Sequence, residues 1–293
     1  MKNNYLIFRT DRIGDFLISA ILLRCIKKND PDAHITVVAS SKNFSYIKSF
    51  PYVNHVILLK NNFFSKLNVF FKLIKFKFKS IIVHDNKNRS KFISFFLRSS
   101  NKLNTFTTKD ISHINIIKNI LEKMNFDFFE DCLNTLSHKE KDFSNKNLIQ
   151  LHFDEKWIFN EYIKKFVNIE PTEIELINFI KKIKNKNEKK LIITTGFIIP
   201  DIMRKIEPVL NDLKIVLYKN LDFLQLEKIT LKSNVLISCH GAISHVASAN
   251  KIKQIDIIDK SYNYKKWTNH FRNYTFLYRD NFAKLSDKII DLI

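Results

Sequence analysis

Short apolar runs alternate with stretches of helical periodicity along the whole chain. In the first half, runs rich in Ile, Val, Leu and Phe predict strands at residues 5–8, 34–39, 55–59, 80–85 and 103–107. Between and after them, apolar residues spaced three and four apart predict helices at residues 16–28, 63–78, 90–98 and 114–124. This alternation is typical of a mostly parallel sheet with helices on both faces.

The alternation starts again in the second half of the chain. A helix over 171–185 is opened by Pro171. The expected strands are residues 147–153, 190–196, 214–219, 234–239 and 254–259. We therefore expect an α/β protein with two Rossmann-like, doubly wound domains, 1–145 and 146–293. Ligands of such sheets bind beyond the carboxyl ends of the strands, so the expected site is a cleft between the domains.

Composition narrows the class of protein. The 293 residues are 45% hydrophobic and 27% charged, which is typical of a globular chain. No uncharged apolar run reaches the length of about 18 residues that a transmembrane helix needs, and the N-terminal apolar stretch is too short for a signal peptide. Cys25, Cys132 and Cys239 have neither metal-site spacing nor a disulfide pattern. We therefore expect a cytoplasmic protein.

The first chemically informative stretch is RTDRIGD, residues 9–15, between the first strand and the first helix. Gly14 is one of only three glycines, and it permits a tight or left-handed turn. Asp15 stands at or next to the N-cap, where a carboxylate stabilises a helix by about 0.5–2 kcal/mol. The same position, at the carboxyl edge of a strand, suits a general base for a substrate hydroxyl. The spacing alone fits both interpretations.

The second half contains a similar turn, SCHGAISH, residues 238–245. Gly241 follows the strand, Ser244 can cap, and the free amides of the next helix suit a diphosphate. The stretch has neither the G-x-G-x-x-G nor the P-loop pattern, so neither a dinucleotide nor ATP is predicted. His240 and His245 are five residues apart, which is poor spacing for two ligands, and no metal is expected. His245 either contacts phosphate or bonds within its own loop.

Together the two turns resemble those of glycosyltransferase family 9, the heptosyltransferases of lipopolysaccharide core assembly. Members begin with a strand, an Arg-x-x-x-x-Gly-Asp turn and an apolar helix, as in RTDRIGDFLIS here. Later family patterns are matched by PDAHITVVA, PYVNHVILL and SCHGAISHVASAN, so the matched order spans residues 5 to about 250. The order and intervals of the motifs carry the resemblance, more than any one of them.

The resemblance implies a GT-B fold and an inverting, metal-independent transfer of sugar, with no cofactor besides an ADP-heptose-like co-substrate. The N-terminal domain would bind the acceptor and the C-terminal domain the nucleotide sugar. Asp15 matches the family's general base. Lys156 is the candidate for the lysine that neutralises the diphosphate, although Lys164 and Lys165 are close by and a solvated surface lysine is the alternative.

On this interpretation the two sites can be assigned by residue. The donor site comprises Lys156, Gly241, Ala242, Ser244 and His245. The acceptor site comprises Arg9, Arg12 and Gly14. The two arginines could hold acceptor phosphates or carboxylates bidentately, and surface salt bridges are the alternative explanation for them.

One part of the second turn departs from the family. Cys239 and His240 stand where members have Asp-Thr, and one extra residue precedes His245. The backbone amides of the turn are kept, whereas the family's acidic contact is lost. Cys239 is better explained as a small buried residue at a strand end than as a nucleophile. The D-x-D pattern of Asp30 and Asp32 follows a helix at the amino edge of the sheet, so a turn explains it without a metal.

Residues 60–102 are basic and rich in phenylalanine, with eleven Lys or Arg and one acidic residue, Asp85. Apolar residues at helical spacing predict a helix that packs on the sheet and carries a solvated basic face; they are Phe63, Leu67, Phe70, Phe71, Ile74 and Phe78. Alternatively, or in addition, the surface meets anionic lipid headgroups or a phosphorylated lipid acceptor.

The net charge of +20 also favours an anionic partner, although a coding bias towards Lys, Asn, Ile and Phe explains it without any binding. We expect a glycosyltransferase that moves a sugar such as heptose from a nucleotide diphosphate to a lipopolysaccharide core or related anionic glycan, at the cytoplasmic face of the inner membrane. The alternatives are a non-catalytic protein of the same fold and a basic nucleic-acid binder. No nucleic-acid-binding module pattern is found, so nucleic acid is not the expected partner.

Overall fold

The structure is a computed structural model, and it describes residues 3–105, 111–134, 147–158, 164–186 and 188–293. The chain divides into two compact units. Unit 1 is Met1–Glu140 with Lys265–His270, and unit 2 is Lys141–Tyr264 with Phe271–Ile293. Residues 145 and 146, between which the domain boundary was expected, lie outside the described residues.

Unit 1 contains a five-stranded parallel sheet in the order β3-β2-β1-β4-β5. Its strands are β1 Asn3–Arg9, β2 Ala33–Ala39, β3 His55–Leu58, β4 Lys77–Val83 and β5 Arg98–Asn104. Its helices are α1 Ile13–Asn29, α2 Phe44–Lys48, α3 Phe63–Leu73, α4 Asn88–Phe95, α5 His113–Lys123 and α10 Lys265–Thr268, with a 3₁₀ turn η1 at Glu130–Asn134.

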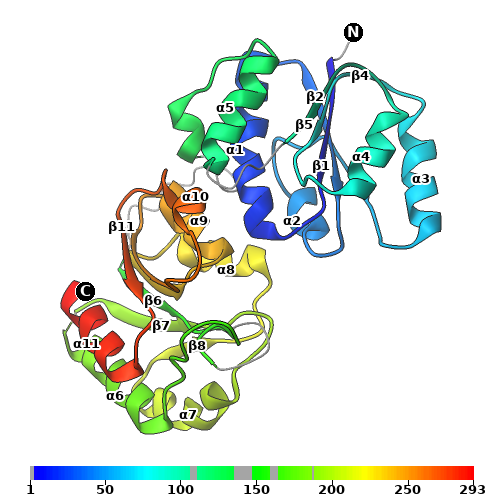
Figure 1. The fold of residues 1–293 in the computed structure, drawn as a ribbon. Coiled ribbons are helices and arrows are strands. Elements are labelled where there is room, and N and C mark those ends of the chain that lie inside the picture. The colour runs from blue at the N-terminus through cyan, green and yellow to red at the C-terminus, as the bar shows by residue number, and fades with distance from the viewer. Residues whose placement is uncertain (1–2, 106–110, 135–146, 159–163, 187) are drawn as a thin grey trace. The chain divides into compact units, whose positions relative to one another are not determined.

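Helices cover both faces of this sheet, with α1 and α5 on one side and α3 and α4 on the other (Figure 1). Leu6 and Phe8 of β1 pack against the α3–α4 side, together with Val69 and Leu73 of α3. After β1, the chain first adds β2 and β3 on one side of that strand and then β4 and β5 on the other side. The strands β1 and β4 pair in parallel. The loops that follow these two strands are therefore neighbours, and such a switch point is where doubly wound sheets bind ligands.

The expected helix over 63–78 is wrong in its end and in its packing face. The helix α3 stops at Leu73, and Phe78 belongs to β4, where it is buried. Within α3 only Val69 and Leu73 are buried, whereas Phe63, Leu67 and Phe71 are exposed. Val69 and Leu73 lie on one face of the helix, and the phenylalanines lie on another. Both faces are apolar, so the spacing of the phenylalanines did not indicate which of them packs on the sheet.

Unit 2 contains a six-stranded parallel sheet in the order β11-β10-β9-β6-β7-β8. Its strands are β6 Leu148–His152, β7 Lys190–Thr194, β8 Val216–Tyr218, β9 Val235–Cys239, β10 Lys253–Ile258 and β11 Tyr274–Tyr278. Its helices are α6 Glu173–Lys186, α7 Asp201–Asp212, α8 Phe223–Thr230, α9 Ala242–Ala249 and α11 Phe282–Leu292. The switch point lies between β6 and β9, so the loops after these strands are neighbours.

The predicted α/β class with two doubly wound sheets is confirmed. Two further local predictions differ from the structure, and the edge strand β11 was not predicted. The strand expected at 103–107 is β5, which begins at Arg98, and residues 106 and 107 lie outside the described residues. Pro171 precedes the first turn of α6, and Thr172 caps the helix through its bonds with Glu175. Among the described residues no helix is long and apolar enough to span a membrane.

Candidate functional site

Asp15 occupies the third position of α1, directly after the loop that follows β1. Its Oδ2 accepts a hydrogen bond of 3.0 Å from the backbone N–H of Arg12, which is the N-cap residue. This is the capping interaction expected of a carboxylate in the first turn. The bond involves Oδ2 and leaves Oδ1 outside the cap. Gly14 lies in the same turn, and none of the three glycines of the chain has a positive φ, so the left-handed turn considered for Gly14 is wrong.

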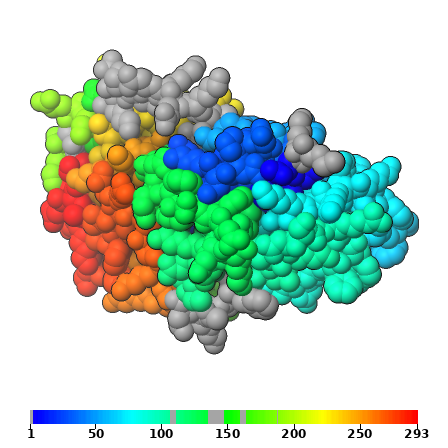
Figure 2. Space-filling model, turned by 90° about the horizontal axis from the view of Figure 1, so that it is seen from above, coloured from blue at the N-terminus to red at the C-terminus, as the bar shows by residue number. Residues whose placement is uncertain are grey.

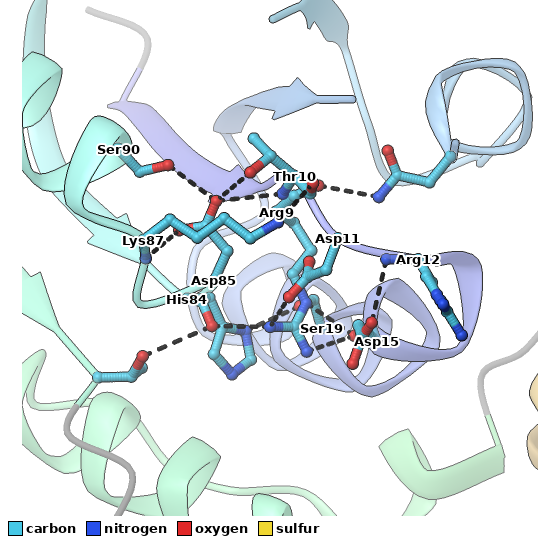
Figure 3. Close-up of polar contacts among 12 residues, drawn as sticks. Arg9, Thr10, Asp11, Arg12, Asp15, Ser19, His84, Asp85, Lys87 and Ser90 are labelled. Carbon is cyan, nitrogen blue, oxygen red and sulfur yellow. Dashed lines mark hydrogen bonds and ion pairs between the residues drawn. The ribbon is translucent and has the colours of Figure 1, made fainter. Parts of the chain in front are cut away.

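The side chain of Arg9 lies between His84 and Asp15, as Figure 3 shows. Its Nε and Nη2 donate to the backbone carbonyl of Asp15 at 2.8 and 2.6 Å, and its Nη1 donates to the carbonyl of His84 at 2.7 Å. The residue is only 3% exposed. Arg9 therefore fixes the first turn of α1 against the end of β4, and a bound acceptor is not needed to explain its position.

A cavity of about 870 Å³ opens at the carboxyl edge of the unit 1 sheet. Asp15 and Arg12 line it, and so do residues that follow β2, β3 and β4. Its charged lining is strongly basic, because five cationic side chains face two carboxylates; they are Arg12, Lys42, Lys60, Lys87 and Arg89 against Asp11 and Asp15. Such a cavity attracts an anionic ligand.

Thr10 and Asp85 join the loops that follow β1 and β4 (Figure 3). Asp85 Oδ2 accepts from the Thr10 N–H at 3.2 Å, the Thr10 hydroxyl at 2.5 Å and the Ser90 hydroxyl at 2.8 Å. Lys87 Nζ and Arg89 Nη2 donate to the carbonyl of Thr10 at 2.8 and 3.3 Å. Two of the cavity's cations are thus anchored to the loop that carries Asp15.

Asp11 is a second carboxylate of the cavity, and no motif in the sequence indicated it. Its Oδ2 lies 3.4 Å from Arg9 Nη1, while its buried Oδ1 has no hydrogen-bond partner among the described residues. Burial raises the pKa of Asp11, Arg9 opposes the rise, and Asp15 and Asp85 add to it. The cavity therefore contains two carboxylates in different environments, one capping a helix and one largely buried.

Histidines lie close to the Arg9–Asp15 contact. His84 Nδ1 is 2.8 Å from the Ser19 hydroxyl, and burial together with Arg9 and His113 holds the pKa of His84 well below its ordinary value. His113 of α5 contacts Trp267 of α10, with ring centroids 3.8 Å apart and the ring planes tilted by 41°. Burial and Arg9 lower the pKa of His113 to about 4, against the opposing effect of Asp15. Neutral imidazoles are therefore favoured on this side of Asp15.

In unit 2 the structure brings Lys156 and Gly241 together. Lys156 follows β6 and Gly241 is the N-cap of α9, and a Cβ built on Gly241 would lie 2.9 Å from Lys156 Nζ. The first amides of a helix have no partners within it, and in α9 these include the amides of Ala242 and Ile243. An ammonium beside a helix N-terminus is a suitable environment for a diphosphate.

Neighbouring residues keep Lys156 charged and in place. Its Nζ forms an ion pair with the buried Asp154. Burial opposes the charge of Lys156, but Asp154 and Glu155 outweigh it and raise the pKa of the lysine. From the end of β11, Arg279 donates to the Lys156 carbonyl at 2.5 Å and to the Val167 carbonyl at 3.1 Å. Arg279 was not singled out in the sequence, because its partners are backbone atoms distant along the chain.

A buried carboxylate lies beneath the second turn. Asp256 of β10 accepts from the hydroxyls of Ser238 and Ser244, both at 2.9 Å, and its Oδ2 is 2.8 Å from His240 Nδ1. The Ser244 hydroxyl also accepts from the Gly241 N–H at 3.2 Å. Gly241 is the N-cap and Ser244 the third residue of α9, so Ser244 bonds back to the cap from within the helix and does not precede a helix that starts at His245. A carboxylate thus lies at this turn, on β10 rather than at residues 239 and 240, and it contacts His240.

His245 and Cys239 of this turn are buried. The ring of His245 packs against Phe271 and His240, with centroids 5.1 and 5.8 Å apart. Cys239 is 1% exposed, and burial raises the pKa of its thiol to about 12, so the thiolate needed for a nucleophile is disfavoured. In unit 1, Asp30 accepts bonds from Tyr5 at 2.6 Å and Asn3 at 2.8 Å at the start of β1, away from the cavity edge.

Comparison with known proteins places this geometry in context. No family model matches the sequence, and no curated protein matches it. Solved structures do. A glycosyl transferase of family 9 from Veillonella parvula DSM 2008 is 13% identical, with 99% of this chain and 90% of that chain covered and a TM-score of 0.69. This chain has the GT-B fold.

Two Escherichia coli structures match over almost their whole length. The heptosyltransferase WaaC with ADP is 9% identical, with 99% of both chains covered and a TM-score of 0.73. The ADP-heptose lps heptosyltransferase II is 13% identical, with 99% of this chain and 96% of that chain covered and a TM-score of 0.69. A putative UDP-N-acetylglucosamine 2-epimerase from Listeria monocytogenes matches at 12% identity and a TM-score of 0.60. At these identities the likeness concerns the fold.

Proposed function

We propose that the protein is an inverting, metal-independent glycosyltransferase that moves heptose from an ADP-heptose-like donor to a lipopolysaccharide core or related anionic glycan. The observation that carries the proposal is the position of Asp15, a carboxylate on the wall of a strongly basic cavity at the sheet's carboxyl edge. The fold shared with family 9 structures supports the same reaction class.

The reaction begins at the acceptor hydroxyl. Its oxygen attacks the anomeric carbon of the donor while Asp15 accepts the proton, and the bond from that carbon to the diphosphate oxygen breaks with inversion. Asp15 Oδ1, outside the cap, is the oxygen that takes the proton. Arg12, Lys42 and Lys60 bind anionic groups of the acceptor, while Arg9 positions Asp15 without touching substrate.

The donor's diphosphate binds at the other turn. Negative charge grows on the diphosphate as the bond breaks, and Lys156 with the amides of Ala242 and Ile243 stabilises it. Asp256 holds His240 by Nδ1, which leaves Nε2 of the ring for the donor. The transfer therefore uses an ammonium group and helix amides for the electrostatic role, and no resident cofactor is part of the proposal.

The test is sugar transfer from ADP-heptose to lipopolysaccharide core by wild type, Asp15→Asn and Asp11→Asn. Asn keeps an oxygen for the cap but cannot accept the proton, so kcat falls by roughly 10²–10⁴-fold in Asp15→Asn. Asp11→Asn keeps the greater part of the activity. A collapse in Asp11→Asn alone would assign the base to Asp11.

Two further outcomes would contradict the proposed function. Thermal stabilisation by ADP-heptose without any transfer favours a non-catalytic protein of this fold. Tight, steeply salt-dependent binding of oligonucleotides, without an effect of nucleotide sugars, favours a nucleic-acid binder. The cytoplasmic face of the inner membrane, where such donors and acceptors meet, is the proposed location.

A further inference from the structure

The helices α3 and α4 expose an unusual number of large apolar side chains. We name these the phenylalanine surface, and its members are Phe63, Phe64, Leu67, Phe71, Ile74, Phe92, Phe95 and Phe96. Phe64 is 80% exposed and Phe95 is 73% exposed. Isolated exposed apolar residues are normal, but a contiguous group on one surface marks an interaction site.

The members belong to one surface because the two helices lie side by side (Figure 1). Phe70 of α3 contacts Phe96, with ring centroids 6.2 Å apart, and Phe96 contacts Phe92 and Phe95 at 5.2 and 5.1 Å. In Figure 2 the atoms coloured cyan and blue-green, which belong to this part of the chain, adjoin one another. The surface is therefore a single apolar face built from two neighbouring elements.

Basic residues border this face. At 100° per residue, the exposed apolar residues of α3 form one stripe, with Lys66 on one edge and Lys72 and Lys75 on the other. Across residues 60–102 there are eleven Lys or Arg, and the one acidic residue, Asp85, is buried in the Thr10 contact. An apolar stripe with basic edges and no exposed acid matches an anionic bilayer, in which rings enter the interface and lysines meet headgroups.

The alternative occupants fit this surface less well. In a symmetric pair of copies the face would meet itself, so lysines would oppose lysines. A protein partner would need pockets for rings that project from two helices, whereas the bilayer interface accepts such rings without complementary shape. We propose that the phenylalanine surface docks on an anionic phospholipid bilayer.

Docking would place the cavity of Asp15 next to the lipid. Lys60 and Asn61 line that cavity immediately before α3, and Asn88 and Arg89 line it at the start of α4. The two helices therefore run from the cavity rim into the phenylalanine surface. Docking does not depend on the proposed sugar transfer; only its consequence does, namely that a lipid-anchored acceptor reaches the cavity from the bilayer.

The test is flotation of the full chain with vesicles of phosphatidylcholine alone or mixed with phosphatidylglycerol. We expect binding to the mixed vesicles, weaker binding in high salt, and little binding to phosphatidylcholine. Phe64→Ser with Phe95→Ser should reduce the bound fraction at least fivefold. The matched control is Ile174→Ser with Phe197→Ser in unit 2, side chains 73% and 85% exposed, which should bind like wild type.

A charge variant and the Asp15→Asn protein complete the test. Lys72→Glu with Lys75→Glu should also weaken binding to the mixed vesicles, without altering the phenylalanines. Asp15→Asn should bind vesicles like wild type, so loss of sugar transfer and loss of docking are separate results. Three results would overturn the proposal: full binding by the Phe64→Ser, Phe95→Ser protein, equal binding to both vesicle types, or a wild-type dimer that this variant converts to a monomer.

Discussion

The ammonium group of Lys156 occupies the space where a side chain at Gly241 would begin, 2.9 Å from an added Cβ. Contacts this close are not tolerated, so one of the two groups must move when residue 241 has a side chain. The far end of a lysine is flexible and moves readily. Gly241 has an extended backbone, φ −170° and ψ −166°, which alanine also adopts. A change at Gly241 thus acts on the position of Lys156 rather than on the backbone.

Gly241→Ala should therefore weaken donor binding without unfolding unit 2. We expect the Kd for ADP, measured by calorimetry, to rise about tenfold, which corresponds to about 1.4 kcal/mol. The matched control is Gly196→Ala, whose Cβ would meet Glu155 and Asp154 at the ordinary distances of 3.7 and 3.9 Å. An equal effect of the two substitutions would show that Lys156 is not part of the donor site.

Arg9→Lys distinguishes a positioning role from acceptor binding. A lysine cannot reproduce the donors that Arg9 directs to the carbonyls of Asp15 and His84. We expect a loss of about 1–3 kcal/mol in unfolding free energy, because buried carbonyls lose their partners. In steady-state kinetics kcat should fall while the KM for acceptor stays near its wild-type value. A large rise in acceptor KM with unchanged stability would instead support the predicted acceptor contact.

Asp256→Asn should destabilise the second turn. The substitution places an amide where the carboxylate accepts from two serine hydroxyls and faces His240 Nδ1. Urea unfolding should show a loss of about 1–3 kcal/mol. If His240 and Asp256 act as a pair, His240→Gln combined with Asp256→Asn should be non-additive in the Kd for ADP. Additive effects would show that the two side chains act independently.

Stability should fall on mild acidification because of buried histidines. Burial lowers the pKa of His113 and of His270 to about 4 in the folded protein, below the ordinary value of 6.5. The unfolded chain therefore takes up these protons first, and the stability present above pH 6.5 is lost as the pH falls towards 4. His113→Gln should flatten this slope by up to one proton in urea unfolding measured across that range.

Much of the fold was predictable, because apolar runs and helical spacing record burial directly. The strands β1 to β10 and the turns after them at Asp15 and at Gly241 follow from that pattern, whereas the edge strand β11 and the order of the strands in each sheet do not. The packing face of α3 did not follow, since phenylalanines at helical spacing indicate an apolar face but not which face meets the sheet. The exposed Phe64 and the buried Val69 are told apart only by the neighbours of the helix.

The roles that the sequence predicted are those of side chains whose partners are only a few residues away along the chain. Asp15 and Ser244 each accept a hydrogen bond from the N-cap amide of their own helix. Arg9, Asp11, Asp256 and Arg279 depend on partners brought in by the fold. Arg9 looks like a surface cation in the sequence but is buried under carbonyls from two loops, and Asp256 looks like one polar residue in a strand but receives three donors. Such roles are long-range properties of the fold.

Thr10 uses its N–H, its hydroxyl and its carbonyl to bind residues that follow β4. With so many bonds between them, the two loops behave as a single rigid body, and the orientation of Asp15 is set before any ligand arrives. These two loops are therefore ordered before a ligand binds in the cavity, and its binding free energy is not reduced by the cost of ordering them. If the proposed function holds, selection among acceptors depends on the exposed Lys42 and Lys60 of the cavity, whose long side chains are its adaptable part.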